Sequence, residues 1–432
     1  YNSGVLRICL GTFHNMYWRE GLRCVRRSTL PRCLPTSLGL RTKCDNAAII
    51  GHHRQHGTLI AQCQRLDRYQ RRNSVHFGVQ VARNSSSWDG DDNMEAAGSS
   101  SNVAFDRKLK VLQRNGAAIA ARKGRMVKTS EEAVDYDYFQ EEIANRLVDR
   151  LDDIIREGGF PLALDVGSGV GHVYRAINAH ESFEGVGGVG GVRKLVQLDS
   201  SAGMLHRDDD LDDTAHDDSE PPFCGAYKMV ADEEGTMPFP DGTFDLVISS
   251  TALHWVNDLP TFLSETKRIL KPDGCLIFAV VGGSTLFELR SSLVLAEMER
   301  DGGVSPHVGP FVDFADVGTL LTSAGFTLPT VDIDTIKLAY PNATVLMEHL
   351  QRMGENNASL NRRSRVGADT FLAAACIYDQ AYPLQDDAED EEDSIEASVQ
   401  VIYAIGWSPH DSQPKPLERG SAKHKMGDVI VE

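Results

Sequence analysis

The stretch that decides the fold is LALDVGSGVGHV, residues 162–173. Its apolar run predicts a short buried strand, and Gly167, Gly169 and Gly171 follow at the spacing GxGxG. A dinucleotide fingerprint is GxGxxG, and His172 holds the place of its last glycine here. The pattern predicts a strand, a glycine turn and a helix that hold a nucleotide-like ligand, and it leaves the identity of that ligand open.

Carboxylates at three points of the chain narrow the choice of ligand. Asp165 stands two residues before the first glycine, where it would repel a pyrophosphate and suit an ammonium or sulfonium group. Asp199 ends the next apolar stretch, residues 195–198, and could accept hydrogen bonds from both ribose hydroxyls. Asp232, with Glu233 beside it, could accept from an adenine amino group. Together these positions favour S-adenosyl-L-methionine over a nicotinamide dinucleotide.

Further alternation of strands and helices follows along the chain. TFDLVISS predicts a strand at 244–249, and LPTFLSETKRIL predicts a helix. A turn at Pro272–Gly274 and a strand at 275–281 come next. Such alternation is typical of a parallel sheet covered by helices on both faces.

Charge divides the chain into an unusual first segment and an acidic remainder. The net charge is −18, yet residues 1–83 hold 14 Arg or Lys against three acids, which leaves 30 basic and 59 acidic residues in the rest. An arginine-rich, acid-poor leader is typical of an organelle transit peptide, and a disordered extension is the alternative. The acidity of the remainder argues against nucleic-acid binding, and no apolar run is long enough for a transmembrane helix.

The predicted organisation has five parts. They are a transit or disordered leader at 1–83, a polar linker at 84–102, a helical segment at 103–157, an S-adenosyl-L-methionine-binding core at 158–281 and a C-terminal substrate or cap region at 282–432. Three segments look like solvated insertions or loops: the glycine-rich run 185–192, the acidic stretch 207–222 and the acidic loop 386–393.

Several of these stretches resemble the successive motifs of class I S-adenosyl-L-methionine-dependent methyltransferases. They are LDVGSGVG, VQLDSS, ADEEGTMPFPDGTFDLVISSTALHWVNDLP and ILKPDGCLIF. FDRKLKVLQRNGAA, the long segment GGSTLFELRSSLVLAEMERDGGVSPHVGPF, MEHLQRMGENNA and IYAIGWSPHDSQPKPLERGSA are similar to a narrower family. That family comprises mitochondrial complex I assembly factors that hydroxylate an arginine.

The resemblance implies a Rossmann-like α/β fold, a doubly wound seven-stranded sheet with an antiparallel last hairpin. It implies S-adenosyl-L-methionine as cofactor and an arginine of the quinone-proximal iron–sulfur subunit of complex I as substrate. It places the protein on the matrix side of the inner mitochondrial membrane, peripherally associated, with other assembly factors as partners. The expected cofactor residues are Asp165, Gly167, Ser168, Gly169, Gly171, Asp199, Ser200, Asp232, Glu233 and Ser249. Ser168 stands where that family usually has a cysteine.

Residues for chemistry are harder to assign. Hydroxylation of an unactivated carbon commonly uses iron on two His and one carboxylate. His206/Asp208 and His216/Asp218 have a suitable spacing, but both lie in an aspartate-rich stretch where chance matches are expected, so no metal site is predicted. The remaining candidates are His254 and Trp255 after a strand, Glu288, Arg290, Glu297 and Glu299 as a groove for a guanidinium, and His307 in a loop at 305–311 over the pocket mouth.

Two other functions stay open on the sequence alone. TLFELR is also similar to segments of biotin-pathway methyltransferases, which would make the protein an O- or N-methyltransferase of a small molecule or a carrier protein. The third possibility is a non-catalytic assembly chaperone whose cofactor site is structural.

Overall fold

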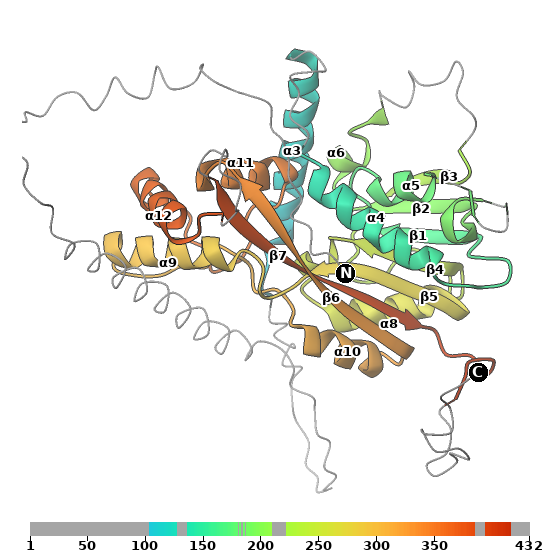
Figure 1. Cartoon of the computed structure of the whole chain (residues 1–432). Helices are drawn as coiled ribbons and strands as arrows, with labels where there is room; N and C mark the ends of the chain where they lie inside the picture. The colour runs from blue at the N-terminus through green and yellow to red at the C-terminus, as the bar shows by residue number, and fades with distance from the viewer. Residues whose placement is uncertain are drawn as a thin grey trace, which may run out of the picture.

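The computed structural model describes residues 103–127, 136–179, 181–182, 185, 187–209, 222–384 and 394–415. In these residues seven strands form one mixed sheet in the order β3-β2-β1-β4-β5-β7-β6 (Figure 1). The strands are β1 (Leu162–Val166), β2 (Lys194–Asp199), β3 (Gly225–Val230), β4 (Phe244–Ser250), β5 (Leu270–Val281), β6 (Thr327–Tyr340) and β7 (Ile395–Trp407).

The direction of the strands confirms the predicted Rossmann-like methyltransferase fold. β3, β2, β1, β4 and β5 run parallel to one another, and β7 runs antiparallel to both β5 and β6. The carboxyl ends of β1, β2 and β4 therefore meet at one edge of the sheet, on either side of the point where the strand order reverses.

Helices cover both faces of the sheet. They are α3 (Arg107–Val127), α4 (Tyr138–Asp152), α5 (His172–Ile177), α6 (Ala202–Leu205), α8 (Leu259–Ile269), α9 (Phe287–Arg300), α10 (Phe314–Ser323), α11 (Ala343–Met353) and α12 (Ala368–Ala381), with short 3-10 turns η1 (Val189–Gly191) and η2 (Leu253–Trp255). Alternate residues of β4 face opposite ways, so Leu246 and Ile248 pack in one core with α4 and α9, and Val247 packs in the other with α8 and α10. In Figure 1, α3 stands upright between α6 and α11, and it contacts both of them.

The predicted turn before β5 is wrong in detail. The sequence predicts a turn at Pro272–Gly274, but β5 already begins at Leu270. Phe244 pairs with Leu270 and Leu246 pairs with Cys275, so the residues between form a bulge in the ladder. A bulge accommodates the proline, which has no N–H to donate, and lets the strand continue.

The glycine-rich run is also different from the prediction. The described part of 185–192 is not a solvated loop, because Val189 and Val192 are buried in the core beneath α4. Gly190 lies so close to Leu151 that a Cβ there would be 2.9 Å from its side chain. The valines fill the core and the glycines permit the close approach of the backbone.

Other predictions fall partly or wholly outside the described residues. The leader 1–83, the linker 84–102 and the loop 386–393 lie wholly outside them, as does most of the acidic stretch 207–222. None of the helices that the structure describes is both long enough and apolar enough to cross a membrane.

Candidate functional site

The glycine turn after β1 forms a backbone cradle that side chains would fill. Gly167 and Gly169 have φ angles of +70° and +58°, which favour glycine. A Cβ on Gly167 would lie 2.2 Å from the Cβ of Ala252, and a Cβ on Gly169 would lie 3.4 Å from a guanidinium nitrogen of Arg114. The main chain of the turn therefore borders a space directly, with no side chain of its own between the backbone and a ligand in that space.

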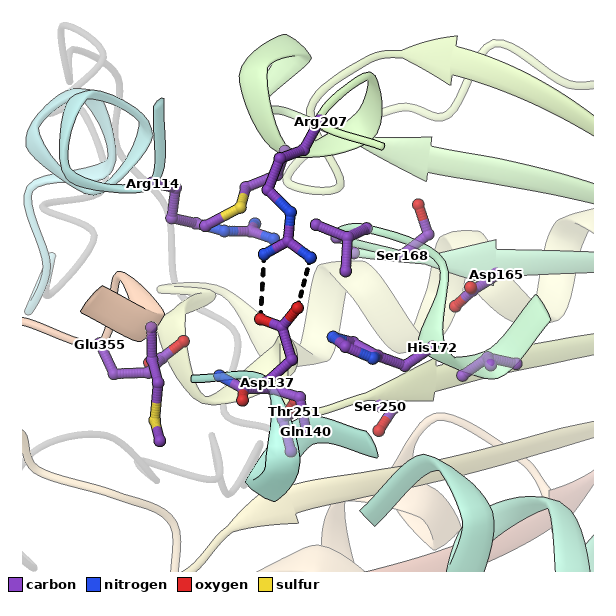
Figure 2. Close-up of a pocket in the computed structure, with 16 residues that line it drawn as sticks. Arg114, Asp137, Gln140, Asp165, Ser168, His172, Arg207, Ser250, Thr251 and Glu355 are labelled. Atoms are coloured by element: carbon purple, nitrogen blue, oxygen red, sulfur yellow. Dashed lines mark hydrogen bonds and ion pairs between the residues drawn. The ribbon is translucent and has the colours of Figure 1, made fainter. Parts of the chain in front are cut away.

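That space is a cavity of about 520 Å³, which we call the glycine-turn cavity (Figure 2). The lining residues come from the glycine turn, α3, α4, the segment after α6, the end of β4 and the end of α11. They are Arg114, Asp137, Gln140, Asp165, Gly167, Ser168, Gly169, Val170, His172, Val173, Met204, Arg207, Ser250, Thr251, Met353 and Glu355.

Asp165 is the feature of the cavity that most clearly indicates a ligand. It is fully buried, and neither carboxylate oxygen has a hydrogen-bond partner among the described residues. Burial first, and then the nearby charge of Asp199, raise the pKa of Asp165 well above its ordinary value. An unpartnered buried carboxylate costs free energy unless a donor or a cation reaches it. An ammonium group at this point would satisfy both oxygens.

Asp199, the expected ribose acceptor, is buried at the end of β2 but fully engaged. It accepts from the main-chain N–H groups of Gly169 (2.8 Å) and Ser201 (2.7 Å). The guanidinium of Arg114, on α3, donates to both oxygens at 3.0 and 2.8 Å. A ribose hydroxyl must therefore exchange with Arg114 to reach this carboxylate.

The expected adenine-binding acids are paired with α3 in the same way. Arg107 lies 2.7 Å from Asp232 and 2.5 Å from Glu233. Glu233 is buried, and its Oε2 has no hydrogen-bond partner among the described residues, whereas the Asp232 side chain is about half exposed. Arg107 and Arg114, seven residues apart on α3, are thus paired with the acids that the sequence predicts to bind the adenine and the ribose.

A second ion pair crosses the cavity and was not predicted from the sequence. Arg207 donates to the carboxylate of Asp137, just before α4, with its Nη1 at 2.9 Å (dashed in Figure 2). Arg207 also pairs with Asp208. The sequence predicts Arg207 in a solvated insertion, which is wrong, because its side chain is only 8% exposed.

Three serines, Ser168, Ser200 and Ser249, are also among the residues expected to contact the cofactor, and they differ in burial and in hydrogen bonding. Ser168 is buried in the lining, and its hydroxyl has no hydrogen-bond partner in the described part of the chain; Ser200 is half-buried directly after β2. The Ser249 hydroxyl donates to the carbonyl of Val166 at 2.7 Å and so links β4 to β1. The next residues, Ser250 and Thr251, line the cavity instead.

His254 and Trp255, the candidate catalytic residues after β4, both contact Glu355, an acid that was not predicted from the sequence. Nε1 of Trp255 donates to Oε2 of Glu355 at 2.7 Å, and Nε2 of His254 lies 3.3 Å from the same oxygen. Burial alone would raise the pKa of Glu355, but the hydrogen bond from His254 and the charge of Lys110 outweigh it and lower the pKa to about 2. Glu355 is therefore a carboxylate at neutral pH.

The other chemical candidates are not assembled into one groove by the structure. Glu297 is bound to the loop 305–311: it accepts a hydrogen bond from the Ser305 N–H (2.6 Å) and pairs with His307 (3.0 Å). Glu288 is buried, and burial raises its pKa to about 7 against the opposing hydrogen bond from Ser398. The side chain of Arg290 reaches the Gly283 carbonyl, and Glu299 is exposed.

The metal candidates have other partners or lie outside the structure. His206 pairs with Asp209 at 2.8 Å, and Asp208 pairs with Arg125 at 2.8 Å. His216 and Asp218 are outside the described residues. Within the part of the chain that the structure describes, no group of three His, Cys, Asp or Glu side chains could hold a metal ion.

Comparison with known proteins identifies the family. Residues 164–278 match a family described as methyltransferase domain. Over 325 residues the chain is 44% identical to a rat protein named arginine-hydroxylase NDUFAF5, mitochondrial, covering 75% of this chain and 83% of that protein. The chain belongs to the family of the NDUFAF5 arginine-hydroxylases. As a member of this family with this fold, it is an enzyme that is transferase-like in architecture.

Two further similarities lie outside the NDUFAF5 family. The chain is 30% identical to a malonyl-[acyl-carrier protein] O-methyltransferase of Laribacter hongkongensis, over 67% of this chain and 90% of that protein. Among solved structures, a phosphoethanolamine N-methyltransferase of Haemonchus contortus in complex with S-adenosyl-L-methionine is 17% identical. Its TM-score is 0.35, and the match covers 62% of this chain and 52% of that one.

Proposed function

We propose that this member of the NDUFAF5 family binds S-adenosyl-L-methionine in the glycine-turn cavity and hydroxylates an arginine of a partner protein. The observation that carries the cofactor assignment is Asp165, a buried carboxylate without a partner at the head of a glycine cradle. The observation that carries the arginine assignment is the 44% identity to a protein named for that activity.

The chain's own residues have distinct tasks in this proposal. Asp165 would accept from the ammonium group of the cofactor, and Asp199 from its ribose hydroxyls after Arg114 has moved away. Asp232 and Glu233 would accept from the adenine amino group once Arg107 releases them. When bound, the cofactor would supply an electrophilic methyl group on its sulfonium, which serves the methyl transfer considered below and is not a source of oxygen for hydroxylation.

The diphosphate of a nicotinamide dinucleotide fits this cavity less well. Its charge would approach the carboxylates of Asp165 and Asp199, which lie close enough for Asp199 to raise the pKa of Asp165. Arg114 and Arg207 also line the cavity, but Arg114 is committed to Asp199 and Arg207 to Asp137.

The finer assignments follow the family resemblance. The substrate would be the quinone-proximal iron–sulfur subunit of respiratory complex I, modified during assembly. The place would be the matrix side of the inner mitochondrial membrane, with residues 1–83 as the transit segment and other assembly factors nearby. The identity to a relative named mitochondrial supports that compartment.

A second candidate is methyl transfer, which the 30% identity to an O-methyltransferase favours. Mass spectrometry of the complex I subunit, isolated from cells with and without the protein, separates the two. The proposal predicts an arginine that is heavier by one oxygen atom only when the protein is present. A gain of one methylene unit supports the methyltransferase, and rescued assembly with an unmodified subunit supports a chaperone.

A further inference from the structure

A second cavity adjoins the glycine-turn cavity and has no role in the proposal above. It has a volume of about 630 Å³ and shares Gln140, Thr251, Met353 and Glu355 with its neighbour. We call it the aromatic cavity, and its other lining residues are Phe139, His254, Trp255, Val281, Thr285, Leu286, Phe311, Leu338, Tyr340, Leu346, Leu350 and Val399.

The apolar walls of the aromatic cavity belong to the core that α4 and α9 cover, at the antiparallel end of the sheet. They include side chains from β5, β6, β7 and α11. Phe311, at the end of the loop that the sequence predicts over a pocket mouth, packs its ring 5.5 Å from His254 and 6.2 Å from Trp255 between centroids. Such a wall suits the aliphatic part of a ligand, and its ring faces attract cations.

Glu355 is the only acidic residue among those that line the aromatic cavity, and no Lys or Arg is among them. Its Oε2 accepts from Trp255 and His254, whereas Oε1 has no hydrogen-bond partner among the described residues. The side chain is 22% exposed, so the unpartnered oxygen is open to a ligand. Oε1 can therefore accept a charge-assisted hydrogen bond from a cationic ligand without losing the bonds that hold Oε2.

The hydrogen bond with His254 fixes the orientation of Glu355. An ionised carboxylate only accepts, so the proton between the two groups belongs to Nε2 of His254. Nδ1 of His254 is buried and has no hydrogen-bond partner among the described residues. Oε1 of Glu355 is therefore the acceptor offered to a ligand head with N–H donors.

Nearby cations do not occupy the free oxygen of Glu355. The Lys110 ammonium donates to the carbonyls of Gly354 (3.1 Å) and Asn356 (2.7 Å). Burial lowers the pKa of Lys110 to about 7, so its charge is weakened at neutral pH. Arg114 is held by Asp199, although its charge also helps to lower the pKa of Glu355.

We propose that the aromatic cavity receives the arginine side chain of the partner protein, with Oε1 of Glu355 as the anchor for its guanidinium. This inference rests on the proposed function and names the residue that selects the substrate. The aliphatic stem of the arginine packs on the aromatic and aliphatic walls, and the planar head donates to Glu355. Because Glu355 lines both cavities, an arginine anchored there lies beside the cofactor.

The charge of Glu355 also favours an arginine side chain over a malonyl group, which the name of the related O-methyltransferase gives as its substrate. A malonyl group carries a carboxylate, which Glu355 would repel at close range. The cavity therefore favours a cationic acceptor over an anionic one.

The test uses the full chain saturated with S-adenosylhomocysteine and two matched probes. They are N-acetyl-arginine methylamide and N-acetyl-citrulline methylamide, which differ in the charge of the head group, and binding is followed by NMR. The wild-type protein should prefer the arginine probe by about tenfold or more, the ratio expected from a charge-assisted hydrogen bond. Glu355→Gln should reduce the ratio to about one, since the amide keeps the bond to Trp255 but loses the charge.

The control is Glu348→Gln on α11, the helix that ends two residues before Glu355, and the Glu348 side chain is half exposed and pairs with Arg352. It should keep the wild-type preference, and Glu355→Asp should keep part of it. Equal binding of both probes, absence of binding at millimolar concentration, or an unchanged preference in Glu355→Gln would overturn the inference. If the subunit nevertheless gains an oxygen atom in cells, the proposed function stands and only the anchor is wrong.

Discussion

At the β1 end of the glycine-turn cavity, Asp165 is buried and neither oxygen is hydrogen-bonded to any residue that the structure describes. Asp199 at the β2 end is as deeply buried and accepts four hydrogen bonds. Both acids follow from the same sequence pattern, yet only one is left without a partner. The difference indicates two modes of ligand recognition within one cavity. A cation would add a missing partner to Asp165, whereas a hydroxyl would replace Arg114 at Asp199.

This contrast has an energetic consequence for the protein without ligand. Asp165 destabilises the folded state, because burial without partners costs free energy. Asp199 stabilises it together with Arg114, because removal of either partner would leave the other charge buried and unpaired. Variants at the two acids should therefore both lose ligand but change stability in opposite directions.

The largest effect is expected when the cradle itself is filled. Gly169→Asp introduces a side chain and a negative charge between the turn and Arg114, and it should weaken S-adenosyl-L-methionine binding roughly 100-fold or more. Calorimetric titration measures this. The control is Gly158→Asp, at an exposed glycine with φ of +76° and nothing near its Cβ, which should bind normally. Normal binding by the Gly169 variant would show that the ligand lies elsewhere.

At the engaged end, Asp199→Ala removes the ribose acceptor and leaves Arg114 unpaired. Ligand affinity should fall on the order of 100-fold, from two hydrogen bonds to a charged acceptor. The free energy of unfolding should fall by about 3 kcal/mol, as for a broken buried pair. Titration and thermal melts measure both quantities. An unchanged melting temperature would contradict the role given to the Arg114 pair.

At the empty end, Asp165→Asn should weaken binding about tenfold to 100-fold but raise the melting temperature at pH 7. The Asp165 pKa is raised in the folded state, so the unfolded chain ionises first and stability falls as pH rises above about 4. The asparagine variant lacks this loss, and its advantage should disappear near pH 4. A destabilised variant at pH 7 would mean that Asp165 has partners in solution.

The same pKa shift predicts proton release on binding. The cofactor ammonium favours ionised Asp165, so ligand affinity should increase by up to about tenfold per pH unit until the raised pKa is passed. Titrations in buffers of different ionisation enthalpy count the protons released. Asp165→Asn is the control and should release none from this position. A wild-type protein that releases no more protons than the variant would contradict the assignment.

The smallest effect is expected at the adenine end. Arg107 competes with the ligand for Asp232 and Glu233, and its ion pair with Asp232 is partly exposed. Arg107→Ala should therefore strengthen S-adenosyl-L-methionine binding, by no more than about fivefold. Arg150→Ala, which removes a partly exposed ion pair with Asp332 remote from the cavity, should leave the affinity unchanged. Weaker binding in the Arg107 variant would show that this arginine supports the ligand.

Local patterns explain why the sheet could be predicted from the sequence. The strands at β1, β2 and β4 are short apolar runs bounded by turn residues, and their period and order suffice to place them. The bulge in β5 could not be predicted, because a Pro-Asp-Gly turn looks the same whether or not the strand continues across it. The burial of Val189 and Val192 depends on a space beneath α4 that only the folded chain contains.

The candidate site was predictable only where its residues follow the strands. Asp165 and Asp199 were placed by their strand ends, whereas Glu355 arrives from the end of α11, far along the chain. The cationic stripe on α3 did have a signal, because Arg107, Lys110 and Arg114 recur at helical spacing. Pairing that stripe with acids elsewhere requires the tertiary fold.

The most direct test of the central claim is a competition between two ligands for the unmodified protein. S-adenosyl-L-methionine and NADH are titrated separately and together by calorimetry at low ionic strength. The account predicts saturable binding of the sulfonium ligand, unaffected by equimolar NADH. Saturable binding of NADH that displaces S-adenosyl-L-methionine would contradict the claim that the unpartnered carboxylate of Asp165 selects a cationic ligand.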